Sequence, residues 1–325
     1  MGGFSIALMI PLLFVSRFLL GAFQGPLFPA TAGGVIARWF PSGSWALPNG
    51  MTSTALALGS ASTPPIIVYL AEYFGWESTF FLISILGVIG ALIWWKYSTN
   101  WPTEHPDINR EELELIGQSD FNNNQMSWPL IKEVLTNKDV LFTALGYMSM
   151  NYVFFIFYSW IFIYFVTIRG FNMLEGSLLA SLPFLMGAIG ATCGGFVCDR
   201  LQMRYGVTWG HRIPIIIGLI PSAGFLLFGS ITENPYLAVL SLSLCYGFIE
   251  LTEGPFWSTI GFISDKPQAA GGILNTGGNL GGVLATPLIP IMVAQYDWVI
   301  ALNTGGVFAF LGVLFFMQVK FKEAD

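Results

Sequence analysis

The sequence is short of charged residues and of cysteines, and each shortage excludes a class of protein. Charged residues make up only 10% of the 325 residues, whereas hydrophobic residues make up 54%. Soluble domains carry about 25% charged residues, so the composition indicates a multi-pass membrane protein without a nucleic-acid partner. The 3 cysteines lie in apolar runs without the spacing of metal ligands, and no nucleophile–base pair is visible. We therefore expect no disulfide framework, no metal site, no cofactor and no enzyme activity.

Nine apolar runs long enough to cross a bilayer follow one another along the chain. They occupy residues 6–37, 47–70, 77–98, 140–167, 174–198, 213–232, 236–262, 269–294 and 298–320. Since a spanning helix needs about 20 residues, these runs predict an all-α membrane protein with about nine transmembrane helices. We predict a partial N-terminal helix bundle at 1–98, a cytoplasmic central loop at 99–139 and a C-terminal six-helix bundle at 140–325.

The placement of lysine and arginine predicts the orientation, because these residues favour cytoplasmic loops. If the first run crosses from outside to inside, the inner loops hold Arg38, Lys96, Arg110, Lys132, Lys138, Arg200, Arg204, Arg212, Lys266, Lys320 and Lys322. Only Arg169 then falls outside, and Arg17 lies within the membrane. This predicts an inner (plasma) membrane protein with a cytoplasmic C-terminus. His105 and His211 fall in inner loops, where we expect them to be solvated.

The stretch from Arg17 to Pro29, R-F-L-L-G-A-F-Q-G-P-L-F-P, places a lone cation inside the first apolar run. No acidic residue is near Arg17 in sequence, and an ionisable group at membrane depth is a functional hypothesis by default. Gln24 lies two turns further along the same helix face. The alternative is an arginine that snorkels from a helix end, although the residues before Arg17 are themselves apolar.

Short patterns of the first helix group recur in the second, which predicts an internal repeat. Q-G-P-L-F from Gln24 recurs as E-G-P-F-W from Glu253. T-P-P-I from Thr63 recurs as T-P-L-I from Thr286 at nearly the same separation. Parallel repeats of this kind relate the two halves of some transporters. The second group has further helices ahead of its repeated part, so we expect roughly three helices to be missing upstream of Met1.

Longer motifs carry a family resemblance. R-x-x-x-G-x-x-x-G-P-x-x-P-A from Arg17, followed by R-W-F-P, resembles the fourth helix of the major facilitator superfamily, specifically its anion:cation symporter group. Further similar motifs are P-T-E-H-P from Pro102, N-Y-V-F-F-I-F-Y-S-W from Asn151, A-S-L-P-F-L-M-G-A-I-G from Ala180, G-G-F-V-C-D-R-L ending at Leu201 and G-G-I-L-N-T-G-G-N-L-G-G from Gly271. The resemblance implies two pseudo-symmetric helix bundles, of which this chain holds family helices 4–12.

The resemblance also implies roles for particular residues. Arg17 is similar to a family arginine that meets the substrate's carboxylate, a role that suits the planar guanidinium fork. Asp199 and Arg200 match the family's inner-loop motif, a conformational latch rather than a substrate ligand. Two departures matter. The family typically has a protonatable glutamate where this chain has Gln24, and the inner loop F-P-S-G-S-W-A from Phe40 lacks the family's usual charged residues.

Other polar residues are candidates to bind the substrate. Asn275 and Asn279 are four apart and share a helix face, so they line a cavity or serve as interhelical glue. Asn151 and Tyr158 are seven apart on one face, where a substrate role competes with aromatic packing. Trp257, which completes the recurring E-G-P-F-W pattern, is a further substrate-binding candidate. The doubled glycines that begin at Gly271, Gly277 and Gly281 favour close helix packing over a phosphate-binding loop, because their spacing is not that of a Walker loop.

Glu250 and Glu253 are candidates for proton coupling. They lie three apart in Y-G-F-I-E-L-T-E-G-P-F-W, deep in an apolar run with no basic residue nearby. Desolvation and a like-charged neighbour both favour the neutral form of a carboxylate, which suits a group that loads and releases protons. The alternatives are structural protonated groups or ligands for a cationic part of the substrate.

Together these features predict a secondary active transporter of small organic anions, such as sugar acids. The mechanism would be alternating access with proton symport, or symport with another coupling cation, in a lipid bilayer. Two alternatives stay open. One is an uncoupled facilitative carrier or exchanger of the same fold, and the other is a truncated, transport-inactive membrane protein.

Overall fold

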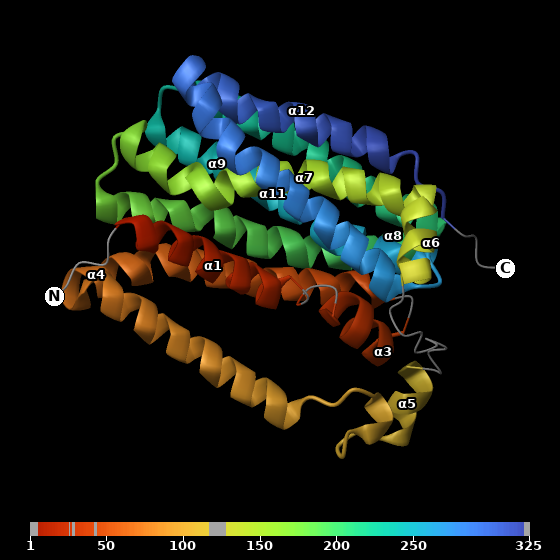
Figure 1. The fold of residues 1–325 in the computed structure, drawn as a ribbon. Coiled ribbons are helices and arrows are strands. Elements are labelled where there is room, and N and C mark those ends of the chain that lie inside the picture. Colours follow the sequence, from red (N-terminus) through yellow and green to blue (C-terminus); the bar gives the residue numbers. More distant parts are fainter. Residues whose placement is uncertain (1–5, 26, 28–29, 42–43, 117–127, 322–325) are drawn as a thin grey trace.

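The computed structural model describes residues 6–25, 27, 30–41, 44–116 and 128–321 of the chain. Within these ranges every regular element is a helix and no strand occurs (Figure 1). Six of the helices are long and apolar enough to cross a membrane. A helix satisfies its backbone hydrogen bonds within one segment, which a bilayer without water requires. The prediction of an all-α membrane protein is therefore confirmed.

The helices fall into two groups joined by a loop that carries short helices. The first group consists of α1 (Ile6–Gln24), the π-helix η1 (Ala30–Ile36), α3 (Ala37–Trp39) and α4 (Ala46–Tyr97). The loop carries the 3-10 helix η3 (Pro102–Glu104), α5 (Arg110–Ile116) and α6 (Trp128–Thr136). The second group consists of α7 (Lys138–Thr167), α8 (Met173–Ile231), α9 (Pro235–Glu250), α10 (Glu253–Ile263), α11 (Pro267–Gln295) and α12 (Trp298–Phe316).

Two of the helices are each long enough to hold two spans. α4 has 52 residues and α8 has 59, whereas one crossing needs about 20. Gly75 interrupts α4 with a φ of 76°, and Gly206 interrupts α8 with a φ of 77°. Glycine adopts this left-handed conformation without the steric cost that a Cβ would bring. Figure 1 shows α4 turning back on itself, so each of these helices contains two of the predicted runs.

The first predicted run is not one continuous α-helix. α1 ends at Gln24, where the Gly25 N–H bonds to the Gly21 carbonyl at 2.8 Å, and the π-helix begins at Ala30. Pro26 and Pro29, which follow in the sequence, lie outside the described residues. A proline offers no N–H to a helix, so the sequence itself does not support an unbroken hydrogen-bond ladder.

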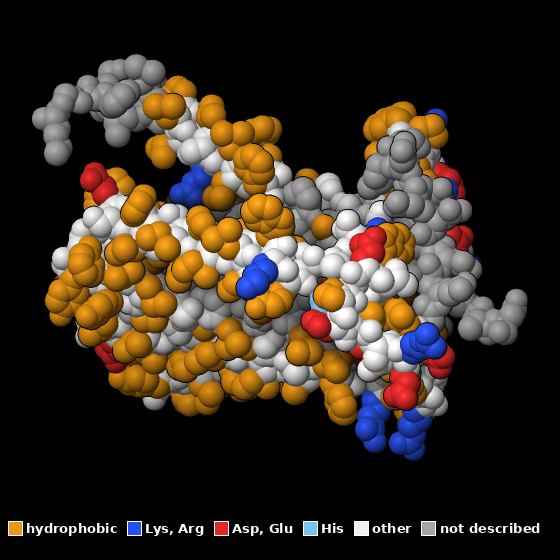
Figure 2. Space-filling model, turned by 90° about the horizontal axis from the view of Figure 1, so that it is seen from below, with side chains coloured by type: hydrophobic (Ala, Val, Ile, Leu, Met, Phe, Trp, Pro, Cys, Tyr) orange, Lys and Arg blue, Asp and Glu red, His pale blue; other side chains and the backbone are white. Residues whose placement is uncertain are grey.

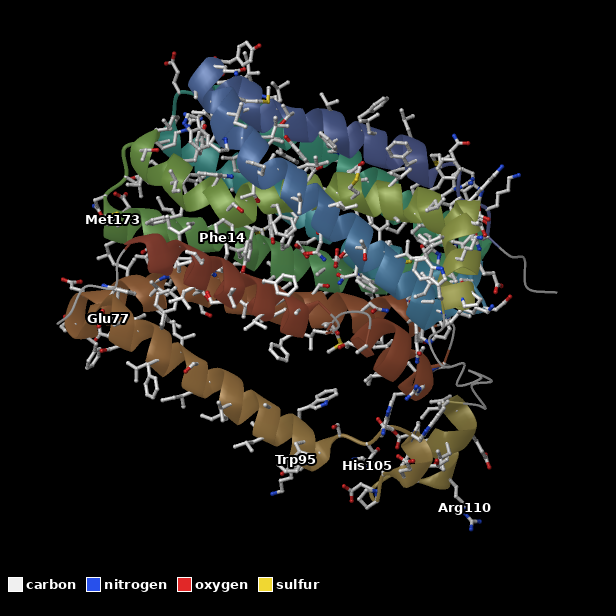
Figure 3. The ribbon with its side chains drawn as sticks, in the orientation of Figure 1. Phe14, Glu77, Trp95, His105, Arg110 and Met173 are labelled. Atoms are coloured by element: carbon white, nitrogen blue, oxygen red, sulfur yellow. The ribbon has the colours of Figure 1, made fainter. Side chains whose placement is uncertain are left out.

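The core of the molecule lies in the second helix group. Its largest fully buried side chains include Tyr152, Tyr164, Tyr246, Phe157, Phe165, Phe256 and Phe316. In the first group, by contrast, Phe14 is 74% exposed and Trp95 is 81% exposed (Figure 3). Figure 2 shows hydrophobic side chains over most of one face, with most charged side chains gathered toward one end. Such a surface fits contact with lipid tails or with further apolar helices.

The loop between the groups contacts both of them. The Arg38 guanidinium lies 4.4 Å from the centre of the Trp101 ring, and the Trp39 and His105 rings meet edge to face at 5.7 Å. The R-W-F-P and P-T-E-H-P motifs are therefore neighbours in space. At the other end of the loop, α6 is tied to the second group by an ion pair between Glu133 and Lys266.

Candidate transport site

Three buried side chains form a hydrogen-bonded group where α7 meets α10. The Tyr147 hydroxyl donates to Glu253 Oε1 at 2.7 Å. The Trp257 indole N–H lies 3.0 Å from the same carboxylate oxygen and 3.1 Å from the Tyr147 hydroxyl. Each of the three side chains is less than 9% exposed, and buried polar groups of this kind require partners. We call Tyr147, Glu253 and Trp257 the Glu253 group.

The two glutamates stand on either side of a helix break. α9 ends at Glu250 and α10 begins at Glu253. Pro255, in the first turn of α10, has no N–H to bond the carbonyl of Leu251, which accounts for the break. Leu251 and Thr252, between the two glutamates, keep helical dihedral angles, so α9 and α10 continue as one apolar span from Pro235 to Ile263 with a local distortion at the glutamates.

Glu250 is buried next to Tyr246 and α8. It is 3% exposed, and a Cβ added to Gly187 would lie 2.5 Å from Tyr246 Cε1 and 3.0 Å from Glu250 Cγ. In the described part of the chain the one ion pair joins Lys266 to Glu133, so neither buried glutamate has a cationic partner there. The arrangement places two uncompensated carboxyl groups inside the second helix group.

Glycines let α11 approach the α7 side of the Glu253 group. A Cβ at Gly278 would lie 2.6 Å from Tyr147 Cε1 and 3.0 Å from Asn151 Nδ2. One at Gly281 would lie 2.3 Å from the Met148 carbonyl oxygen. Real Cβ atoms do not approach backbone or ring atoms so closely, so the doubled glycines serve helix packing, as we expected. Close packing also confines the Tyr147 ring.

The asparagine candidates differ in their surroundings. Asn151 is 8% exposed, and its Nδ2 donates to the Tyr147 carbonyl of its own helix at 3.0 Å. Asn275 Nδ2 donates to the Gly25 carbonyl at 2.9 Å, which links α11 to the first helix group. Asn279 is exposed and donates to the Asn275 carbonyl at 2.8 Å. Asn275 thus links α11 to the first helix group through a hydrogen bond, whereas the side chain of Asn279 is exposed.

Arg17, Gln24 and Tyr158 are all exposed. Within the described residues no hydrogen bond or ion pair involves Arg17, so its guanidinium is available to an anion. Tyr158 is 58% exposed and stacks on Phe154 with ring centres 5.8 Å apart. Tyr158 is therefore exposed and packs on an aromatic ring, whereas Asn151, on the same helix, is buried.

Asp199 joins the two helix groups. Its Oδ1 accepts from the Ala46 N–H at 3.1 Å and its Oδ2 from the Leu47 N–H at 2.9 Å. These are the first two residues of α4, whose N-cap residue, Trp45, makes no side-chain cap. Asp199 on α8 therefore caps a helix of the other group. A Cβ at Gly50 would lie 2.4 Å from the Ala191 carbonyl oxygen, so α4 and α8 cross closely here.

The prediction that His211 is solvated is wrong. The side chain is fully buried in α8, where Nδ1 lies 2.8 Å from the Val207 carbonyl and Nε2 lies 2.9 Å from Ser258 Oγ. The helix resumes directly after Gly206 and turns this residue toward α10. His105 is half-buried rather than fully solvated.

Tyr147 and its bond to Glu253 were not predicted from the sequence. A signal was present, since a tyrosine or tryptophan buried in an apolar run usually finds a hydrogen-bond partner. Glu250 and Glu253 are the acidic residues of the α9–α10 segment. The sequence does not say which glutamate each aromatic residue meets, because that depends on how α7 packs on α10.

The comparison with protein families decides which family the chain belongs to. The family model described as "Major Facilitator Superfamily" matches residues 1–271. The chain belongs to the Major Facilitator Superfamily. The superfamily is one of membrane transporters, and it is the family that the motifs of the sequence resemble.

Several curated relatives of this superfamily chain are transporters of small anions. The probable galactarate/D-glucarate transporter GudP of Bacillus subtilis is 33% identical over 304 residues, which cover 89% of this chain and 65% of GudP. The hexuronate transporter of Bacillus subtilis is 29% identical, over 98% of this chain and 75% of the relative. The chain thus spans 65% of the length of GudP.

A solved superfamily structure shares the fold. FucP, the fucose:proton symporter of Escherichia coli, aligns with a TM-score of 0.50 at 12% identity, and the alignment covers 94% of each chain. At this identity the likeness concerns the fold alone. As for metals, no group of three or more His, Cys, Asp or Glu that could hold an ion occurs in the part that the structure describes.

Proposed function

We propose that this chain acts as a secondary active transporter of small organic anions, with sugar acids as the substrate class. The names of its relatives support an anionic substrate. They are described as transporters of galactarate/D-glucarate, of hexuronate and, for SauU of Cupriavidus necator, of sulfoacetate. These compounds are small and polar, and each carries at least one carboxylate or sulfonate group.

The observation that carries the proposal is the isolated Arg17. This cation lies on an apolar helix, is exposed, and has no ion-pair partner among the described residues. A guanidinium holds its charge at any physiological pH and binds a carboxylate through two parallel hydrogen bonds. We assign Arg17 as the anchor of the substrate's negative charge. Gln24 and Asn279, which are exposed, are the neutral polar groups that we propose to contact the rest of the substrate.

We further propose that transport is coupled to protons through Glu253, with Glu250 as its buried neighbour. A carboxyl group without a cationic partner has no ion pair to break when it takes up a proton. Glu253 also occupies, in the internal repeat, the place that corresponds to Gln24. The alternative is an uncoupled exchanger, which the glutamine at position 24 favours.

The two helix groups would alternate in access to the substrate by rocking against each other. The contact between Asp199 and the N-terminus of α4 closes one end of their interface. Such a contact must break and re-form in each cycle, because α4 and α8 belong to different groups. This makes Asp199 a latch rather than a ligand.

The test of the substrate anchor is uptake of radiolabelled glucarate by membranes that contain the protein. We expect Arg17→Lys and Arg17→Ala to lower uptake by about 10- to 100-fold, because a hydrogen bond to a charged group contributes about 1.5–3 kcal/mol. Arg204→Lys, on an exposed arginine whose guanidinium lies over the Tyr205 ring at 5.3 Å, is the matched control. Unchanged uptake in both Arg17 variants would favour a snorkelling arginine.

The test of coupling uses an imposed pH gradient. Proton symport requires that Glu253→Gln lose gradient-driven accumulation while it still exchanges labelled for unlabelled glucarate. If the carrier is uncoupled, the wild-type protein itself would exchange glucarate but would not accumulate it in response to the pH gradient. These outcomes separate the two candidate functions.

A further inference from the structure

The hydroxyl of Tyr147 is the contact that joins the Glu253 carboxylate to a different transmembrane helix. Trp257 also donates to Glu253, but it lies one turn further on α10 itself. Its bond therefore survives any movement of α10 as a unit. The Tyr147 bond runs from α7 to α10 at 2.7 Å and must change when these helices shift.

The Tyr147 ring has little freedom to turn its hydroxyl elsewhere. It is 5% exposed and lies 5.5 Å from the Phe256 ring and 5.9 Å from the Trp257 ring, measured between centres. On the α11 side, the backbone of Gly278 occupies the remaining space. The hydroxyl therefore points at Glu253 because the packing of three helices holds it there.

The strength of this bond depends on the charge of the carboxylate. A hydrogen bond to an ionised acceptor is roughly twice as strong as one between neutral groups. When Glu253 is ionised, the hydroxyl and the indole N–H both donate to Oε1. When it takes up a proton, the same contacts become neutral and the attraction between α7 and α10 weakens.

Other titratable groups surround α10 without replacing Tyr147. The elements packed against α10 contribute Glu250 and Tyr246 from α9 and Cys198, Asp199 and His211 from α8. Asp199 is occupied by the two amides of α4, and His211 by Val207 and Ser258. α11 and η1 contain no acidic or basic residue. α4 approaches α10 through its first turns, near Ala46 and Gly50, and its charged residues, Glu72, Glu77 and Lys96, are exposed and lie in its later part.

We propose that Tyr147 is a positioning residue for Glu253, which holds the ionised carboxylate against α7 and loosens the α7–α10 contact when the carboxylate is protonated. The proposal rests on the proton-coupling role proposed for Glu253. It adds a physical link between that proton and the packing of α7, α10 and α11. The asparagines of α11 lie on the helix whose Gly278 confines the tyrosine.

The test measures the protonation of Glu253 directly and not through transport. Infrared difference spectra of the purified protein are recorded as a function of pH, and the Glu253 carboxyl band is identified by its loss in Glu253→Gln. Tyr147→Phe keeps the ring and removes the donor. We expect the midpoint of the band to move upward by about one pH unit, because the ionised form loses a hydrogen bond.

A second substitution covers the case in which Tyr147→Phe does not fold. Fluorotyrosine at position 147 has nearly the same shape and a more acidic, stronger donor, so the midpoint should move downward. Tyr236→Phe is the matched control, because it removes a tyrosine–glutamate bond to Glu175 at an exposed site. A midpoint unchanged in both Tyr147 variants would overturn the proposal.

The same samples separate this inference from the proposed function. If Glu253→Gln retains gradient-driven accumulation, proton coupling through Glu253 is wrong, whatever the infrared midpoints. If Glu253→Gln loses accumulation while Tyr147→Phe leaves both the midpoint and accumulation as in the wild type, the coupling role stands and the role of Tyr147 is wrong.

Discussion

Removal of the Asp199 carboxylate should release the N-terminus of α4 from α8. Asp199 accepts the amide hydrogens of Ala46 and Leu47, and Ala46 is fully buried. Without the carboxylate, the Ala46 N–H has no water to bond while α4 stays docked. The variant therefore lowers the stability of the docked arrangement relative to one in which α4 has moved away.

The size of the effect follows from capping and from the helix dipole. A lost N-cap costs about 1 kcal/mol, and a charge at a partly buried helix terminus contributes up to about 2 kcal/mol. For Asp199→Ala we take about 2 kcal/mol in total, which corresponds to roughly a 30-fold change in population. Asp199→Asn keeps one acceptor oxygen, so about 1 kcal/mol and roughly a fivefold change are expected.

Alkylation of Ala46→Cys measures this population. The side chain at this position is buried where α4 crosses α8, so a maleimide reacts with it only after α4 has moved. Peptide mass spectrometry distinguishes position 46 from the native cysteines. In the Ala46→Cys background, we expect the alkylation rate at position 46 to rise in the order Asp199, Asp199→Asn, Asp199→Ala.

The control is Arg204→Gln, which removes an exposed charge further along α8 without touching the two amides. Its rate should equal that of the wild type. Alkylation rates within twofold of the wild type for both Asp199 variants would refute the latch, because the two amide bonds would then not hold α4 against α8.

Two further predictions concern stability. Arg169→Gln should lower the free energy of unfolding by about 2–3 kcal/mol, because the guanidinium donates hydrogen bonds to the carbonyls at the end of α8. Thermal unfolding measures this, with the exposed Arg204→Gln as the control, and equal melting temperatures of the two variants would contradict the prediction. Gly278→Ala should cost about 1–3 kcal/mol through overlap with Tyr147, whereas Gly272→Ala, with nothing within 4 Å, should melt like the wild type.

Much of the fold follows from the sequence because the bilayer leaves few choices. Apolar runs of spanning length must be helical, and the interruptions of α4 at Gly75 and of α8 at Gly206 fall between the predicted runs. The first run is the exception. Its apolar composition predicts a single helix, but α1 ends at Gln24 and a π-helix follows. Hydropathy reports where a segment is buried and does not report the local hydrogen-bond pattern.

The candidate site was only partly predictable. The burial of Glu250 and Glu253 follows from their position inside an apolar run. The bond from Tyr147 does not, because it joins residues 106 positions apart. His211 was placed wrongly for a related reason, since its polar neighbours in sequence suggested solvent while its partner, Ser258, lies 47 positions away.

Asp199 and Glu253 are both buried carboxyl groups, but their hydrogen-bond donors differ in kind. Asp199 meets the N-terminus of α4 through two backbone amides, which remain donors whatever the side chains do. Glu253 lies in the first turn of its own helix, and its donors are two side chains, Tyr147 and Trp257. A side-chain donor can turn away or change strength while its helix stays in place, whereas a backbone amide leaves its acceptor only when its helix moves. For this reason the first carboxylate is suited to fasten two helix groups together, and the second is suited to change its protonation while the helices remain folded.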